Sequence, residues 1–333
     1  MSIAHANISV FVPNLGCKHA CSFCNQVHIT GTHSLPDENT ITAAVNAAKT
    51  SKNYNPKTTE LAFFGGSFTA IEATYMLSLL KVGKSFIDSG DISGIRVSTR
   101  PDAINDKVLE VLKNHGVTSI ELGAQSLDDE VLTLNKRGHK AEDVVAASKL
   151  IKSYGFSLGL QMMTGLFGDT DEKALKTAES IISLSPDTVR LYPTIVLKNT
   201  YLQKLYEQGV YTPQTVEEAA VLCAKLVPSF KKHNIKVIRL GLHSIESESY
   251  VAGPWHSAFG EIVESKIYLE KLKEELKIHP KGDYLVTVPL SEVSKIIGQK
   301  RANIIALSKL GYNIKVQGNK HKNGIEIGEL KCC

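Results

Sequence analysis

Residues 14–25 read N-L-G-C-K-H-A-C-S-F-C-N and place Cys17, Cys21 and Cys24 on one short stretch directly after an apolar run. Thiolates are the soft ligands that iron–sulfur clusters and zinc select, so three of them at C-x3-C-x2-C spacing can converge on one metal centre. A four-iron cubane held by three cysteines keeps one iron without a protein ligand. The stretch therefore predicts a metal centre that an outside molecule can approach.

Two alternatives remain open from these cysteines alone. Structural zinc needs a fourth protein ligand to complete its tetrahedron, and His19 and His28 are the nearby candidates. The cysteines could also stay reduced without any metal, since short motifs match by chance.

The spacing, with the aromatic Phe23 just before the last cysteine, resembles the radical S-adenosylmethionine (SAM) superfamily. The resemblance implies a [4Fe-4S] cluster on Cys17, Cys21 and Cys24, with the amino and carboxylate groups of SAM on the open iron. It also implies that an electron from the cluster splits SAM to give a 5′-deoxyadenosyl radical.

The bulk composition is that of a globular protein, with 43% hydrophobic and 22% charged residues in a chain of 333. This length suits an α/β barrel with an appendage. No apolar run approaches the ~20 residues that span a bilayer, and the N-terminus has no signal-peptide pattern. Six cysteines, three of them clustered, do not form a secreted disulfide framework. We therefore expect a cytoplasmic protein without membrane association.

Short apolar runs alternate with helical patterns along most of the chain. The runs predict strands at residues 8–13, 59–66, 95–100, 119–125, 156–163, 188–194 and 235–242. The patterns predict helices at 41–48, 71–87, 103–115, 127–154 with a break near Gly138, 171–184 and 199–232. Such alternation predicts an α/β fold with a parallel sheet covered by helices. With the superfamily resemblance, we expect a partial (β/α) TIM-type barrel with a helical extension over residues 1–280.

Ligands of such folds bind at the carboxyl ends of the strands, where this chain has glycines and polar residues. These are Gly65, Gly66, Ser67, Ser98, Arg100, Gln125 and Gln161. Glycines allow close backbone approach, arginine grips carboxylates, and buried amides need partners. The alternatives are an ordinary turn at the glycines, an arginine that only caps a sheet edge, and amides that only bond to neighbouring loops. The superfamily resemblance implies that these residues and Phe23 surround SAM, with the glycine pair at its methionine amino group.

A closer resemblance covers about 240 residues in six ordered blocks that begin at 63, 98, 121, 135, 160 and 191: F-F-G-G-S-F-T-A, S-T-R-P-D, E-L-G-A-Q-S-L-D-D-E-V-L, N-K-R-G-H, L-Q-M-M-T-G-L-F-G-D-T and L-Y-P-T-I-V-L-K-N-T-Y-L. They resemble the radical SAM core of the Elongator complex catalytic subunit. That family modifies carbon 5 of the wobble uridine in tRNA, using acetyl-CoA. Here the cysteine spacing is shorter than in that subunit, and we expect no acetyltransferase-like domain, so only the radical generator carries over.

The tail holds the whole positive excess, because residues 281–333 carry a net charge of +5 within a chain total of +4. Its pattern of strand, helix, tight loop, helix and two strands resembles a KH module, which clamps single-stranded nucleic acid. The loop residues Gln299, Lys300 and Arg301 are therefore expected to hold RNA, although Arg301 stands where that family has glycine. The alternative is a small domain used for packing or for a protein partner.

We therefore expect a radical SAM enzyme that modifies RNA, in particular tRNA, with flavodoxin or ferredoxin as electron donor. The alternatives are radical SAM chemistry on a small molecule such as a porphyrinogen, and a non-enzymatic RNA-binding protein with a structural metal site. No residue is assigned a catalytic role, because hydrogen abstraction depends on positioning the radical. Further candidates for the pocket are Tyr192, His243 and Trp255, and Cys332 with Cys333 could bind a second cluster.

Overall fold

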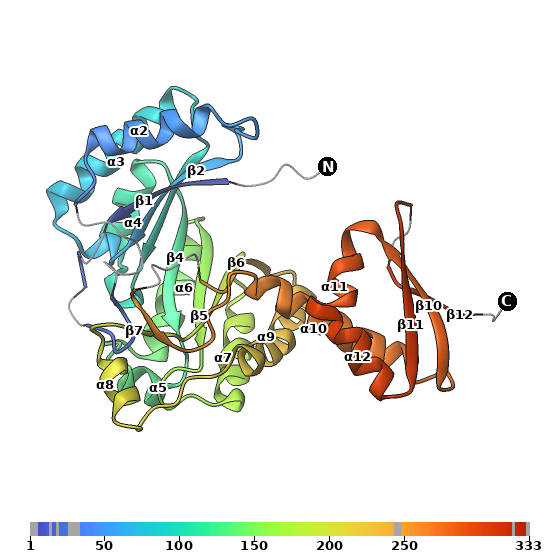
Figure 1. The fold of residues 1–333 in the computed structure, drawn as a ribbon. Coiled ribbons are helices and arrows are strands. Elements are labelled where there is room, and N and C mark those ends of the chain that lie inside the picture. The colour runs from blue at the N-terminus through green and yellow to red at the C-terminus, as the bar shows by residue number, and fades with distance from the viewer. Residues whose placement is uncertain are drawn as a thin grey trace. The chain divides into compact units, whose positions relative to one another are not determined.

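A computed structural model describes residues 6–12, 15–17, 20–25, 34–242, 248–321 and 324–330. The chain divides into two compact units (Figure 1). The first comprises Met1–Gln214 and Phe230–Trp255, and the second comprises Thr215–Ser229 and His256–Cys333. The domain boundary expected after residue 280 falls inside the second unit and stays a prediction. The expected pocket residue His243 and the pair Cys332 and Cys333 lie outside the described residues.

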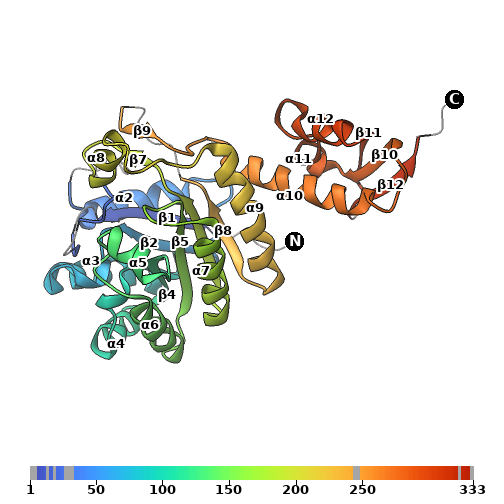
Figure 2. The ribbon, with the colours of Figure 1, turned by 90° about the horizontal axis from the view of Figure 1, so that it is seen from below.

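The first unit is built on a seven-stranded sheet in which every neighbouring pair is parallel. The strands, in spatial order, are β1 (Ala6–Val12), β2 (Thr59–Gly65), β3 (Gly94–Thr99), β4 (Val117–Gln125), β5 (Ser157–Thr164), β6 (Thr188–Pro193) and β8 (Lys236–Leu240). The sheet curls into a half-barrel, with β1 and β8 as its two edges (Figure 2). The predicted α/β class and partial TIM-type barrel are confirmed.

Helices follow the strands in the predicted alternation. They are α2 (Glu38–Lys49), α3 (Ala73–Asp88), α4 (Asp106–Asn114), α5 (Asp129–Leu134), α6 (Ala141–Ser153), α7 (Asp171–Leu184), α8 (Tyr201–Glu207) and α9 (Val216–Lys232). The single helix predicted over 199–232 is wrong, because α8 and α9 are separate. Gly209 has a φ of 71° just after α8, and Pro213 restricts the backbone of the connection. A further pair of short strands, β7 (Val196–Leu197) and β9 (Tyr250–Ala252), is antiparallel.

The two faces of the sheet differ in chemistry. Apolar side chains that are fully buried, such as Phe63, Ile95 and Leu122, alternate along the strands with residues of the opposite face. That opposite face carries buried charged residues, which include Glu60 and Arg96. Helices α3, α4, α6 and α7 contact strands β3 to β5. The concave face of the half-barrel is therefore polar, although each strand reads as an apolar run.

The second unit contains α10 (Phe259–Leu276), β10 (Gly282–Pro289), α11 (Val293–Ile297), α12 (Ala302–Lys309), β11 (Tyr312–Asn319) and β12 (Glu326–Glu329). Strand β10 is central, parallel to β11 and antiparallel to β12. Its core joins the sheet to the helices through Leu272, Leu276, Val286 and Leu307, which are fully buried. The element order predicted for the tail is confirmed, and α10 packs against it as part of the same core.

Candidate functional site

The cysteine stretch is anchored to the turn after β2 by direct backbone contacts. The Gly66 amide donates to the Val12 carbonyl over 2.9 Å, and the Ser67 amide donates to the Leu15 carbonyl over 2.9 Å. A Cβ on Gly66 would lie 2.0 Å from the Leu15 oxygen, and one on Gly65 would lie 2.6 Å from the Val12 oxygen. Both positions therefore require glycine, because the cysteine stretch approaches so closely. Their expected contact with SAM stays a prediction.

The three cysteines have free thiols that influence one another electrostatically. Cys17 is exposed, whereas Cys21 and Cys24 are half-buried. Burial, reinforced by the Cys21 and Cys17 thiolates, raises the pKa of Cys24 to about 12. Partial desolvation, with the charge of Cys21, also raises the pKa of Cys17. Metals bind the deprotonated thiolate and not the thiol. These cysteines therefore lose their protons when a cationic centre offsets the negative charge of the thiolates.

Among the residues that the structure describes, no three His, Cys, Asp or Glu side chains form a group that could hold a single metal ion. A structural zinc draws every ligand to within ~2.3 Å of one ion. A cubane cluster instead takes one thiolate at each of several iron atoms, so its sulfurs stand apart. The assignment of Cys17, Cys21 and Cys24 as cluster ligands stays a prediction. The alternative ligands His19 and His28 lie outside the described residues.

A buried serine inside the motif fixes the cysteine stretch to the rest of the unit. Ser22 is fully buried; its amide donates to the Asn135 carbonyl over 3.0 Å, and its Oγ donates to Asn135 Oδ1 over 2.7 Å. The Ser22 carbonyl accepts from the Leu202 amide over 2.7 Å. Asn135 Nδ2 in turn donates to the carbonyls of Val131 and Phe167, both over 2.8 Å. Three separate segments, at Val131–Asn135, Phe167 and Leu202, therefore hold the loop in one conformation.

Arg137 supplies positive charge at the cysteines. It is 7% exposed, and its Nη1 donates to Cys21 Sγ over 3.0 Å while its Nη2 donates to the Gly123 carbonyl. Its charge lowers the pKa of both Cys17 and Cys24, against the effect of burial. The guanidinium carbon lies 6.0 Å from the centre of the Phe23 ring. Arg137 therefore lies close to both Phe23 and Cys21, so these predicted residues belong to one site.

Several polar atoms near the carboxyl ends of β3 and β4 are buried without a hydrogen-bond partner in the described part of the chain. They include Ser98 Oγ, Arg100 Nη1, Gln125 Oε1 and Arg137 Nε. Arg100 donates from Nε and from Nη2 to the Asp102 carboxylate, each over 2.9 Å. Gln125 has a φ of 67°. Buried polar groups are normally paired, and backbone strain is concentrated at functional sites. These atoms fit a polar ligand such as SAM.

Ser67 and Gln161 have protein partners instead. The Ser67 hydroxyl is 2.9 Å from that of Thr99 and accepts from the Arg100 amide over 3.2 Å. The amide nitrogen of Gln161 donates to Glu121 Oε2 over 3.3 Å. Both contacts match the structural alternative, and cofactor contact by these two side chains stays a prediction.

His139 is a further residue of this region that the sequence analysis did not select. It is 7% exposed, and neither ring nitrogen has a hydrogen bond of ordinary geometry in the described structure, although the Ala124 carbonyl faces the ring. Burial, with the charge of Arg137, lowers its pKa to about 4. His139 is therefore neutral at physiological pH.

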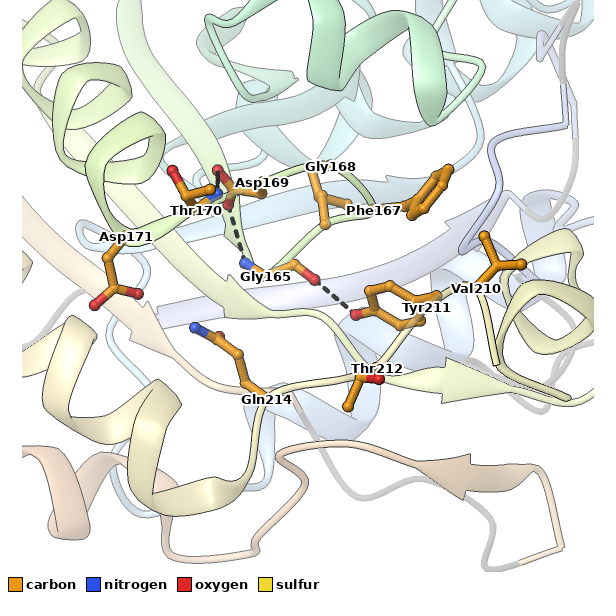
Figure 3. A pocket seen from close by; sticks show the side chains of 11 residues that line it. Gly165, Phe167, Gly168, Asp169, Thr170, Asp171, Val210, Tyr211, Thr212 and Gln214 are labelled. Atoms are coloured by element: carbon orange, nitrogen blue, oxygen red, sulfur yellow. Dashed lines mark hydrogen bonds between the residues drawn. The ribbon is translucent and has the colours of Figure 1, made fainter. Parts of the chain in front are cut away.

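A cavity of about 320 Å³ lies beside the carboxyl end of β5, between residues 165–171 and residues 210–214 (Figure 3). Asp169 accepts from the Gly165 amide over 3.0 Å, and the Tyr211 hydroxyl donates to the Gly165 carbonyl over 2.6 Å. Burial raises the pKa of Asp169 to about 6. Because the Phe167 carbonyl accepts from Asn135, these contacts brace the loop that supports the cysteine stretch.

The loop between α11 and α12 in the second unit presents two exposed cations. Lys300 and Arg301 have φ values of 49° and 62°, in the left-handed region that favours glycine. Asn303 anchors the loop, since its Nδ2 donates to the Ser265 carbonyl over 2.9 Å and the Ile296 carbonyl over 3.1 Å. Strain at an exposed cationic loop is typical of a functional segment.

Comparison with known proteins identifies the class. The model of the radical SAM superfamily matches residues 11–181, and that of the radical SAM C-terminal domain matches residues 186–269. The chain belongs to the radical SAM superfamily. It is therefore an enzyme of that class, and the cofactors expected from its sequence, a [4Fe-4S] cluster and SAM, are those of the superfamily.

The relatives specify the branch more closely. The tRNA uridine(34) acetyltransferase of Dehalococcoides mccartyi is 32% identical over 46% of this chain and 38% of its own. The enzyme of the same name from Methanocaldococcus infernus is 29% identical over 64% of this chain and 43% of its own. The chain thus spans about two-fifths of the length of these relatives.

A solved structure supports the fold. Archaeal Elp3 from Methanocaldococcus infernus, solved with an N-terminal deletion, superimposes with a TM-score of 0.66 at 22% identity, over 84% of this chain and 65% of its own. The predicted resemblance to the radical SAM core of the Elongator subunit is confirmed at the level of fold. The KH-like module stays a prediction. Among the described residues, no helix is long and apolar enough to cross a membrane.

Proposed function

We propose that this chain modifies RNA, in particular tRNA, by radical SAM chemistry. The observation that carries the proposal is the set of unpaired buried atoms on Ser98, Arg100, Gln125 and Arg137 beside the cysteine trio. Such atoms provide hydrogen-bonding capacity for a polar cofactor at the place where the superfamily requires one. The relatives named for tRNA uridine modification support RNA as the substrate class.

The site residues take separate roles in this proposal. Cys17, Cys21 and Cys24 would hold the [4Fe-4S] cluster, and Phe23, Gly65, Gly66, Ser67, Ser98, Arg100, Gln125 and Gln161 would surround SAM. When bound, the cluster and SAM would supply the capacity to abstract a hydrogen atom from a C–H bond of the substrate. Arg137 favours the thiolate form of the neighbouring cysteines, and Ser22 with Asn135 keeps their loop in position. Neutral His139 adds no charge to this end of the barrel.

RNA binding is proposed for the second unit. Its order of strand, helix, loop, helix and two strands resembles that of a KH module, and the loop carries Gln299, Lys300 and Arg301. Two exposed cations in a tight loop suit phosphate oxygens, and the charge excess of the tail adds attraction. We also propose that the protein works in the cytoplasm with an acidic one-electron donor such as flavodoxin or ferredoxin.

The test is mass spectrometry of tRNA nucleosides from a strain that lacks this chain. We expect at least one modified nucleoside to disappear and to return on complementation with the wild type. Complementation with the Cys21→Ala variant should not restore it, whereas Cys223→Ala should, since Cys223 lies in α9 and is not part of the motif. An unchanged nucleoside profile would contradict the tRNA assignment.

A further inference from the structure

Two arginines stand side by side on the concave face of the half-barrel. Arg190 of β6 and Arg239 of β8 are register partners in the parallel pair, so their side chains leave the sheet on the same face. Arg190 binds Glu121 in two places, over 2.7 and 2.9 Å. Like charges directly opposite each other on neighbouring strands are destabilising, so this pair needs an explanation.

The acids of this face are already engaged. Glu60 accepts from Arg96 over 2.8 Å and from the hydroxyls of Thr118 and Ser119 over 2.6 and 2.8 Å. Glu121 accepts from Arg190 and, over 3.2 Å, from Arg96. Arg96 and Arg190 therefore occupy these two carboxylates, and neither carboxylate binds Arg239 in the described structure.

Arg239 is the cation left over. Its Nε donates to the Gly241 carbonyl over 3.1 Å, and in the described part of the chain its two terminal nitrogens have no hydrogen-bond partner. It is half-buried and lies one residue before the carboxyl end of β8, the end at which α/β folds bind ligands. A partly desolvated guanidinium with two free terminal nitrogens is suited to a carboxylate or phosphate.

Tyr192 completes the arrangement. It lies two residues after Arg190 on the same strand and face, and its phenol interacts with both Arg190 and Arg239. Burial raises its pKa, so the hydroxyl keeps its proton and remains a donor at physiological pH.

We propose that Arg239 and the Tyr192 hydroxyl bind an anionic oxygen group of the substrate, a phosphate or a carboxylate, inside the half-barrel. The proposal rests on the function proposed above in taking this interior as the place of the substrate. Strand β8 is the sheet edge opposite β1, which leads into the cysteine stretch (Figure 2). The anion site therefore lies at the other edge of the sheet from the cysteine stretch, and it adjoins Gln161, the residue assigned to SAM that shares Glu121 with Arg190.

The test compares the 333-residue chain with its variants Arg239→Gln, Arg239→Lys and a control, Lys236→Gln, at an exposed position of the same strand. The Tm is measured against inorganic phosphate at constant ionic strength. We expect Arg239→Gln to need about ten- to one hundred-fold more phosphate for the same rise in Tm. Arg239→Lys should respond in between, and Lys236→Gln should respond like the wild type.

A second measurement distinguishes an Arg239 that binds an anion from an Arg239 that only stabilises the fold. Without phosphate, Arg239→Gln should have a higher Tm than the wild type, because the repulsion from Arg190 is removed. A lower Tm, or an undiminished phosphate response in this variant, would overturn the proposal. General salting effects of phosphate cancel, since they act equally on all four proteins.

Acetate distinguishes the two sources of the anion. A wild-type response to phosphate but not to acetate indicates an RNA phosphate, and a response to acetate alone indicates a small carboxylic acid. No response to either probe overturns the site. All these measurements use protein without cluster or SAM, so a failure of radical chemistry would be seen separately, as absence of 5′-deoxyadenosine release.

Discussion

Ser22 Oγ donates to Asn135 Oδ1 over 2.7 Å, and both side chains are fully buried although 113 residues separate them in the sequence. The contact joins the centre of the cysteine motif to the segment before α6. It makes the geometry of the three thiolates depend on residues that bind no metal. Its energetic weight can be measured directly.

Ser22→Ala should leave Asn135 Oδ1 buried without its donor and lower the free energy of unfolding by about 1–3 kcal/mol. The iron content after reconstitution should fall as well, because the loop loses one of its anchors. The control is Thr133→Ala, which removes an exposed hydroxyl bonded to the Asp129 carbonyl in α5. Equal stability and equal iron content in Ser22→Ala and wild type would contradict the role of this contact.

Arg137→Gln should slow the alkylation of Cys17 by iodoacetamide at pH 8 about two- to tenfold in protein without metal. The reason is that the guanidinium lowers the pKa of this exposed thiol, and the thiolate is the form that reacts. Peptide mass spectrometry gives the rate. Lys140→Gln, at an exposed position three residues later, is the control and should leave the rate unchanged. Faster alkylation of Cys17 in Arg137→Gln would mean that Arg137 only packs the loop.

Asp169 should make the protein less stable as the pH rises through about 6. Burial, with the nearby Asp128, raises its pKa above 3.8, so the folded state favours the protonated carboxyl and loses that advantage on ionisation. The difference between 3.8 and about 6 corresponds to about 3 kcal/mol. Denaturation of Asp169→Asn between pH 4 and 8 should therefore show a weaker loss of stability towards high pH.

The neighbour Asp171 provides the control for this experiment, because it is exposed at the first position of α7. Asp171→Asn should keep the pH profile of the wild type. His139 acts in the opposite sense, since its lowered pKa costs stability as the pH falls below 6.5, and it is present in all three proteins. If Asp169→Asn and the wild type have parallel profiles, Asp169 is not the titrating group.

Arg301→Gly should stabilise the second unit and weaken RNA binding at the same time. Glycine relieves the left-handed backbone at a φ of 62°, which costs another residue about 1–2 kcal/mol. Loss of one phosphate contact should lower the slope of log K against log salt by about one. Lys309→Gln removes an exposed charge from α12 in ordinary helical conformation and should bring no gain in Tm. An Arg301→Gly protein that binds tRNA with wild-type affinity and salt slope would exclude this loop from the RNA site.

The sheet and its helices could be predicted because the signals are local. Each strand is a short apolar run, and Gly116 just after α4 and Gly138 between α5 and α6 have a positive φ. The inner face was harder to predict, since Glu121 and Arg190 each lie singly within apolar runs and pair only when β4 and β6 come together. The break between α8 and α9 was not predicted. Helix-forming residues lie on both sides of it, and in the sequence pattern they outweighed the signals of Gly209 and Pro213.

The cysteines of the site were visible from their spacing, but their supports were not. Arg137 contacts Cys21 from 116 residues away, and nothing in the sequence around Cys21 points to it. The block N-K-R-G-H that begins at Asn135 was recognised without a role for its side chains. Folding supplies that role, because the block packs against the cysteine motif.

The most direct test of the account is anaerobic reconstitution of the full chain with iron and sulfide, followed by reduction in the presence of SAM. We predict about four irons per chain and release of 5′-deoxyadenosine in the wild type and in Cys223→Ala, and neither in the triple variant Cys17→Ala, Cys21→Ala, Cys24→Ala. A wild-type protein that retains one zinc ion and releases no 5′-deoxyadenosine would contradict the account.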